Sequence, residues 1–265
     1  MSLAGRAEGR RPLWRDRRSL AIVGAVALVV AAVGVPVALW LMSPRQAQLL
    51  IVNAGGRPSA MIEDGDSRVL ILNTDDREEA LSLASRLSPV LASNPSVVIA
   101  PPGDKFAPAL LAVVEQLRPA QVIVAGAPGA APDWTVVEQA CRRLGIGLRY
   151  TGEMVSFDGP ALRVAVLGTR DDEQAAAVVV RRGGVNLVIA LTRGRVPAHG
   201  QVLVTDAPEG AANVDLVIAT NTAGPPRRLE VVIERGDVVR VAIDPSAVRI
   251  YGGTRREPAS ERGNR

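Results

Sequence analysis

A run of 23 residues without a charged side chain lies near the start of the chain, and it constrains the fold more than any other feature. The run, LAIVGAVALVVAAVGVPVALWLM, begins at Leu20 and ends at Met42. A helix of this length, rising about 1.5 Å per residue, crosses a hydrocarbon core of about 30 Å. Trp40 stands near the end of the run, where interfacial aromatic side chains are common. The sequence therefore predicts one transmembrane helix over residues 20–42.

The charges that flank this run predict its orientation. Residues 1–19 hold six arginines against two acidic residues, Glu8 and Asp16. Positively charged flanks stay in the cytoplasm. We therefore expect residues 1–19 on the cytoplasmic side of the cell membrane and the chain beyond the linker 43–47 on the extracytoplasmic side. A cleaved signal peptide is the alternative, but its apolar region is usually about 7–15 residues long. The length of the run and the poor cleavage site after it favour an uncleaved anchor.

The net charge of +4 comes from the cytoplasmic arm alone. Outside residues 1–19, the sequence has 25 basic and 25 acidic residues, so the exported part is formally neutral. The whole chain has two Phe and two Tyr, which leaves little aromatic surface for stacking on bases. Nucleic acid as a partner is therefore possible but not supported by charge. The sequence does not exclude a local basic patch for nucleic acid, formed by Arg181, Arg182, Arg227 and Arg228.

One histidine and one cysteine limit the chemistry of the chain. A disulfide within the chain is impossible, and a histidine-rich dinuclear zinc centre is excluded, because zinc sites use several His or Cys ligands. We expect His199 in an exposed loop. Cys141 falls within a helical pattern, where a small buried side chain is the simplest interpretation. No cofactor is expected.

Beyond the linker, apolar runs alternate first with helices and then follow one another with only short turns between them. Since helices cover apolar strands in such patterns, the sequence predicts one α/β domain over residues 48–252. A polar tail at 253–265 is expected to be disordered. The expected strands of the first half are 48–53, 59–63, 68–73, 96–100 and 121–126, and its expected helices are 75–91, 108–117 and 132–145.

Three stretches suggest a family. Residues 53–76, NAGGRPSAMIEDGDSRVLILNTDD, combine a glycine-rich turn with a strand that ends in polar residues. Residues 97–117, VVIAPPGDKFAPALLAVVEQL, form a strand, a loop and a helix, and 204–210, VTDAPEG, follow a later strand. Their order resembles the metallo-β-lactamase fold, especially the C-terminal domain of ComEC-type competence proteins. The resemblance covers about 48–251 and implies an αββα sandwich of two facing sheets.

The metal ligands of that family have no counterparts here. Its His-x-His-x-Asp-His loop corresponds to residues 101–106, with Pro101 and Gly103 at the first two histidines, Lys105 at the aspartate and Phe106 at the last histidine. A lysine at a ligand position repels a divalent cation, and a phenyl ring offers no lone pair. The resemblance thus implies a metal-free domain that is not catalytic and binds an envelope protein, a ligand or DNA.

Four residues are the candidate ligand-binding set of this altered cleft: Asp75, Asp76, Asp104 and Lys105. The simpler account treats Asp104 and Lys105 as solvated or mutually paired loop charges and the other aspartates as turn and cap residues. The alternative function is a hydrolase or phosphodiesterase with a carboxylate-only Mg²⁺ or Ca²⁺ site. That site would use Asp64, Asp66, Asp75, Asp76 and Asp104.

Overall fold

The computed structural model describes residues 47–87, 94–169, 175–195, 200–207, 214–221 and 229–256. The chain divides into two compact units, Met1–Pro44 and Arg45–Arg265, and every described residue belongs to the second. The transmembrane run expected at 20–42 lies outside the described residues. Within the described ranges, no helix has the length and apolar character needed to cross a membrane.

One eight-stranded sheet, here called sheet A, has the strand order β15-β14-β1-β2-β3-β4-β5-β6. Its strands β3 to β6 are parallel, and the other neighbours are antiparallel. The bounds of its strands are β1 (Gln48–Ala54), β2 (Arg57–Asp64), β3 (Ser67–Ile71), β4 (Val97–Ala100), β5 (Gln121–Val124), β6 (Gly147–Tyr150), β14 (Val238–Ile243) and β15 (Val248–Tyr251).

The second sheet, sheet B, has the order β16-β13-β12-β11-β10-β9-β8-β7. Its strands β10 to β13 are parallel to one another, and antiparallel strands complete both sides. The bounds of its strands are β7 (Met154–Asp158), β8 (Arg163–Leu167), β9 (Ala177–Arg182), β10 (Val185–Ala190), β11 (Val202–Thr205), β12 (Leu216–Ala219), β13 (Leu229–Val232) and β16 (Thr254–Arg256).

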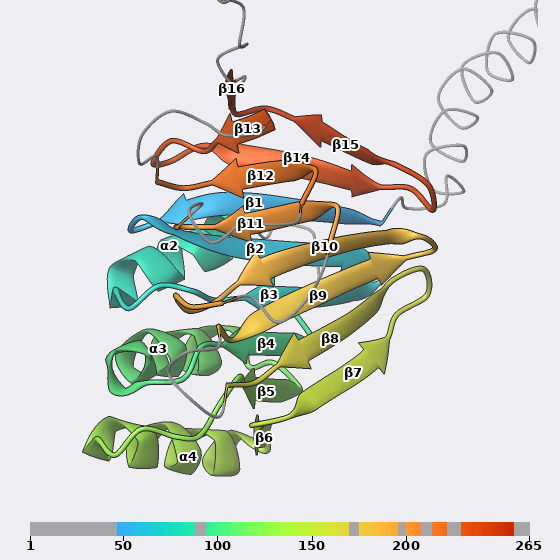
Figure 1. The fold of residues 1–265 in the computed structure, drawn as a ribbon. Coiled ribbons are helices and arrows are strands. Elements are labelled where there is room, and N and C mark those ends of the chain that lie inside the picture. Colours follow the sequence, from blue (N-terminus) through green and yellow to red (C-terminus); the bar gives the residue numbers. More distant parts are fainter. Residues whose placement is uncertain are drawn as a thin grey trace, which may run out of the picture. The chain divides into compact units, whose positions relative to one another are not determined.

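Helices α2 (Arg77–Leu87), α3 (Ala107–Leu117) and α4 (Pro132–Leu144) lie along one side of sheet A (Figure 1). A single 3₁₀ turn, η2 (Asp104–Phe106), precedes α3. Proline stands in the first turn of α3 and of α4, where its missing N–H costs nothing. Gly145 ends α4 in the left-handed conformation, with φ of 70°. The buried side chains of these helices pack against sheet A as one apolar cluster.

The main core lies between the two sheets and consists of Val, Ile, Leu and Ala side chains. Alternation along β1 shows how one strand serves two layers: Leu49 and Ile51 belong to the core between the sheets, whereas Val52 packs on the helix side. The mixed α/β two-sheet sandwich predicted from the sequence is confirmed. The described residues place no helix on the outer face of sheet B, so the second helical layer of the αββα arrangement stays a prediction.

The prediction of a disordered tail from Gly253 was wrong for its first residues. Thr254–Arg256 form β16, which pairs antiparallel with β13. The Arg256 guanidinium lies 3.7 Å from the carboxylate of Glu230, which is only 5% exposed. A buried carboxylate requires a partner of this kind. The domain therefore extends at least to Arg256, and residues 257–265 lie outside the described residues.

The amide side chain of Asn53, at the end of β1, connects the two sheets. It donates to the backbone carbonyls of Thr220 (3.0 Å) and Ile233 (2.9 Å), which follow β12 and β13. Its Oδ1 accepts from the backbone N–H of Gly56 at 2.9 Å. Asn53 is only 6% exposed, and its two bonds to sheet B are buried. The bonding capacity of this amide is thus used to hold the sheets together.

We expect the Asn53→Asp substitution to lower the free energy of unfolding by about 3 kcal/mol, because it removes two donors from buried carbonyls and adds a charge. Urea denaturation followed by circular dichroism measures the change. Asn94→Asp is the control, since Asn94 is exposed and donates one bond, to Leu117 O. Equal losses in the two variants would contradict the role given to Asn53.

Candidate functional site

The C-terminal ends of the parallel strands of both sheets lie at one edge, here called the carboxyl edge. Two contacts between the sheets besides those of Asn53 establish this. Asn73, after β3, donates to the carbonyl of Ala190 at the end of β10 (3.5 Å), and the Thr220 hydroxyl donates to the carbonyl of Gly56 (2.8 Å). Ligands of open α/β sheets bind outside the carboxyl ends of the strands. This edge is therefore the candidate functional site.

Buried polar side chains gather at the carboxyl edge. Most of the buried polar side chains in the described ranges lie there, although burial of such groups is costly without hydrogen bonds. The Oδ1 atom of Asn73, which is 1% exposed, has no hydrogen-bond partner among the described residues. The buried polar residues of this edge are Asn53, Asn73, Thr74, Thr151, Thr205 and Thr220.

Four residues at this edge form what we call the Phe106 cluster: Arg57, Asp75, Lys105 and Phe106. One carboxylate oxygen of Asp75 lies 3.1 Å from the Arg57 guanidinium and 3.9 Å from the Lys105 ammonium. Both cations lie 5.1 Å from the centroid of the Phe106 ring, which is only 5% exposed. The cluster joins the start of β2, the residues after β3 and the turn η2.

The electrostatics of the Phe106 cluster favour an anion. Two cations share one carboxylate, so these four residues carry one excess positive charge, while the carboxylates of Asp76, Glu79 and Asp104 lie on the adjoining segments. The Lys105 and Asp75 side chains are 56% and 44% exposed, and exposed ion pairs contribute only about 0–1 kcal/mol each. The aromatic ring keeps the cations close together through cation–π contacts. An incoming carboxylate or phosphate could therefore reach both cations without disrupting a strong interaction.

The other two predicted site residues have structural roles. Asp76 is the N-cap of α2: its Oδ1 accepts from the N–H of Glu79 at 2.9 Å, and its carbonyl accepts from the N–H of Ala80 at 3.0 Å. Asp104 points away from the cluster and accepts from the N–H of Ala131 at 3.0 Å. The structure thus brings together Asp75 and Lys105 of the predicted set, while Asp76 and Asp104 hold neighbouring segments.

Asp104 also explains the glycine-rich loop between β5 and α4. A Cβ atom at Gly129 would lie 1.7 Å from Asp104 Oδ1 and 2.8 Å from the Nε1 atom of Trp134. Only glycine allows the backbone to approach the carboxylate this closely. The loop therefore lies against a side chain of the domain itself.

The five aspartates of the carboxylate-only site do not assemble. Asp64 and Asp66 lie at the turn between β2 and β3, and the register pairs Asp64 with Ser67. Asp75 follows the far end of β3, beyond the pair Ala60–Ile71, so the length of a strand separates the two groups. Asp64 Oδ2 instead accepts from the N–H groups of Ala161 and Leu162, both at 2.8 Å.

We expect Asp64→Ala to cost about 2–4 kcal/mol of unfolding free energy, because two backbone N–H groups lose their buried partner. The measurement is urea denaturation of the Asp64→Ala variant. Asp237→Ala is the control, because it removes an exposed carboxylate in a turn. A metal ligand would behave differently: its loss would abolish stabilisation by added Mg²⁺ and leave the metal-free protein unchanged. That pattern would contradict a structural role for Asp64.

The remaining chemical candidates do not add to the site. Cys141 is buried in α4, and burial raises the pKa of its thiol, which keeps it protonated and unreactive. Arg181 donates to Asn186 Oδ1 and Arg182 to the carbonyl of Ile243, so each already has a partner. His199, Arg227 and Arg228 lie outside the described residues. Within the described ranges, no group of three or more His, Cys, Asp or Glu side chains is placed to hold a metal.

Sequence reasoning missed Arg57, Asn53 and Asn73. Arg57 stands in the glycine-rich turn region, where a charged residue is ordinary. Its partner Asp75 lies 18 positions later in the chain. The two asparagines carry out their roles only through contacts with sheet B. No local pattern could have shown any of these roles.

Comparisons with known proteins show similarity at the level of structure only. No family model matches the chain, and no curated protein matches it. The metallo-β-lactamase fold protein YhfI from Bacillus subtilis is similar to it with a TM-score of 0.47 and 9% identity, over 74% of this chain and 100% of that one.

Two further solved structures are similar over shorter parts. The short form of human tRNase Z, ELAC1, has a TM-score of 0.37 and 10% identity, covering 64% of this chain and 76% of that one. A diphosphatase from the PhnP family has a TM-score of 0.35 and 13% identity, over 67% and 77% of the chains. With TM-scores below 0.5, none of these supports an argument about this chain.

Proposed function

We propose that this chain is a membrane-anchored binding protein that recognises an anionic group at the carboxyl edge of a metal-free, ComEC-like domain. The helix at 20–42 would anchor the domain outside the cell membrane, with residues 1–19 in the cytoplasm. The Phe106 cluster is the observation that carries the proposal. It places an exposed cation, Lys105, and a partly exposed one, Arg57, at the edge where ligands of such sheets bind.

The same cluster argues against metal-dependent hydrolysis. Lys105 stands in the loop between β4 and α3, and its ammonium would repel a divalent cation bound there. The carboxylate of Asp104 in this loop already accepts a hydrogen bond from Ala131. A carboxylate-only hydrolase would also need Asp64 and Asp66, which lie beyond the far end of β3. Binding without catalysis is therefore the better account.

The anionic group is a carboxylate or a phosphate. Arg57 has a planar guanidinium that can donate two parallel hydrogen bonds to either group, and Lys105 adds a compact charge beside it. An acidic segment of an envelope protein and a small anionic ligand would present the same chemistry. DNA would present it as well, although the neutral exported domain gives DNA less support than a protein or small ligand.

Binding is tested on the full-length chain in detergent by NMR titration with inorganic phosphate and with glutarate. We expect saturable shifts of the Lys105 and Phe106 amide resonances. Lys105→Gln should weaken binding about three- to fivefold, the factor that corresponds to an exposed ion pair. Arg143→Gln is the matched control. Arg143 also forms an exposed ion pair, 3.1 Å from Glu115, and this pair lies away from the carboxyl edge.

The readout at Lys105 and Phe106 is local, so binding of anions to the arginine-rich arm does not affect it. A preference for phosphate over glutarate would direct the search toward nucleotides or DNA, and the reverse toward acidic protein segments. Shifts that do not saturate at tens of millimolar of either anion would contradict the proposal. Equal weakening in Lys105→Gln and Arg143→Gln would contradict it as well.

The hydrolase alternative is tested on the same protein by two measurements. After loading with Zn²⁺, Mn²⁺, Mg²⁺ or Ca²⁺ and desalting, we expect less than about 0.1 equivalent of each metal, because the loop lacks a ligand set. We also expect no metal-dependent cleavage of bis(p-nitrophenyl) phosphate. Cleavage that is lost in the Asp75→Asn/Asp76→Asn double variant would establish the hydrolase instead. Asparagine still caps a helix, so this variant should fold.

A further inference from the structure

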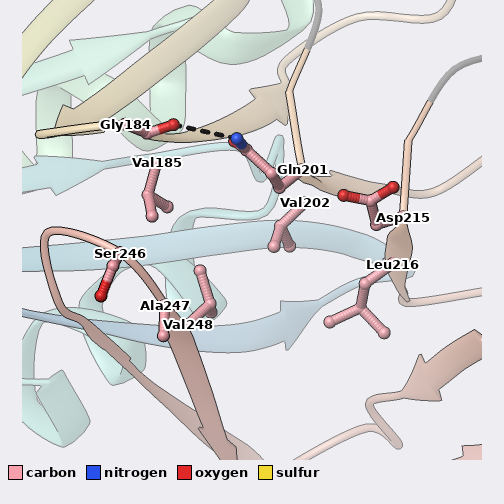
Figure 2. A pocket seen from close by; sticks show the side chains of 9 residues that line it. All are labelled: Gly184, Val185, Gln201, Val202, Asp215, Leu216, Ser246, Ala247 and Val248. Atoms are coloured by element: carbon pink, nitrogen blue, oxygen red, sulfur yellow. Dashed lines mark hydrogen bonds between the residues drawn. The ribbon is translucent and has the colours of Figure 1, made fainter.

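A pocket of about 330 Å³ opens at the edge opposite the carboxyl edge. Its walls come from the starts of β10, β11 and β12 in sheet B and from the turn between β14 and β15 of sheet A. Figure 2 shows the residues that line it, with Val185 and Val202 on one side and Val248 on the other. The volume is at the lower end of the range for small-molecule sites, which is about 300–1,000 Å³.

The floor of the pocket is apolar and belongs to the core between the sheets. Val185 and Val202 are 4% and 2% exposed and are members of the main core cluster, against which Leu216 and Val248 pack. Leu216 and Val248 are only partly buried, so a ligand on this floor would cover the apolar surface that they still expose. The pocket is therefore an open depression whose floor is the end of the core between the sheets.

The walls are held in place by hydrogen bonds that do not involve a ligand. The Gln201 side chain donates to the carbonyl of Gly184 at 2.9 Å, as Figure 2 shows, and accepts from the N–H of Asn186 at 2.6 Å. The Gln201 carbonyl accepts from the N–H groups of Asp215 and Leu216, both at 3.0 Å. These bonds fix the starts of β10, β11 and β12 relative to one another, so the sheet B side of the pocket is preformed.

The opposite wall is fixed to sheet B by a close approach of two backbones. The N–H of Gly184 donates to the carbonyl of Pro245 at 3.1 Å. Gly183, with φ of 55°, lies so close that a Cβ atom there would be 2.6 Å from the same carbonyl. This contact keeps the β14–β15 turn at a constant distance from sheet B, and the opening therefore does not depend on a mobile side chain.

One charged side chain lines the pocket, and it is negative. Asp215 is exposed at the rim, and its carboxylate has no ion-pair or hydrogen-bond partner among the described residues. The hydroxyl of Ser246 and the amide of Gln201 are the other polar side chains of the lining. Charge complementarity therefore selects a cation, and the floor selects an apolar body attached to it.

We propose that this pocket binds a small organic cation, an amine carried on an apolar body, with the amine at Asp215 and the body on Val185, Val202 and Val248. This site is separate from the anion site at the carboxyl edge and does not depend on it. Of the two, the pocket has the apolar floor on which the body of a small molecule can lie. The Phe106 cluster offers charge on an exposed surface.

The test uses phenethylamine as the probe and 2-phenylethanol as its neutral counterpart, titrated into the full-length chain by NMR. We expect phenethylamine to produce saturable shifts of the amide resonances of Val185, Gln201, Val202 and Leu216, and 2-phenylethanol to bind more weakly. Asp215→Asn should weaken phenethylamine binding about three- to fivefold, and the difference should disappear in molar salt. Asp237→Asn, which removes an exposed carboxylate at the other edge, should leave binding unchanged.

A second variant tests the place of binding independently of charge. Ala247 is exposed at the rim, and Ala247→Trp should fill the opening and abolish the shifts while the rest of the spectrum is retained. The proposal is overturned if phenethylamine gives no saturable shift. It is also overturned if Asp215→Asn binds as tightly as the unchanged chain, or if Ala247→Trp folds and still binds.

Discussion

The arrangement of both proposed sites depends on how two sheets, each with strands from distant parts of the sequence, are held face to face. An apolar core between sheets supplies most of the stabilisation but little directional preference, because dispersion and hydrophobic contacts are non-directional. The relative orientation of the two sheets is set by a few hydrogen bonds between polar groups of sheet A and sheet B. At the carboxyl edge, the amides of Asn53 and Asn73 bond to backbone carbonyls of sheet B. At the opposite edge, Asp64 and the Gly184–Pro245 contact serve the same purpose.

Because both edges are fixed, the two ends of the sandwich can have different chemistry. The carboxyl edge concentrates polar side chains and presents the exposed Lys105 and the partly exposed Arg57 around Phe106. The amino ends of β10 to β12 leave an apolar opening with Asp215 at its rim. An anion site and a cation site at opposite ends of one rigid core could be occupied at the same time without competing.

The sequence predicted most of the elements and little of what joins them. Apolar runs and turn residues placed the strands and helices of the first half to within a few positions, since alternation and caps are local properties. Strand β16 was missed because it pairs with β13, a segment far from it in the chain, and only this pairing brings Arg256 beside Glu230. Lys105 and Asp75 were predicted as site residues, but Arg57 was not, because only the fold brings it to Asp75.

The aspartates show why residue type alone did not define the site. Five carboxylates near strand ends suggested a cation site, but three of them serve the backbone: Asp64, Asp76 and Asp104 accept hydrogen bonds from main-chain N–H groups. A carboxylate in such a bond stabilises a turn or a helix end and is a poorer ligand for a metal. Asp75 differs because its partners are side-chain cations, Arg57 at 24% and Lys105 at 56% exposure. In the proposed anion site, an incoming anion would take the place of Asp75 as the partner of those cations.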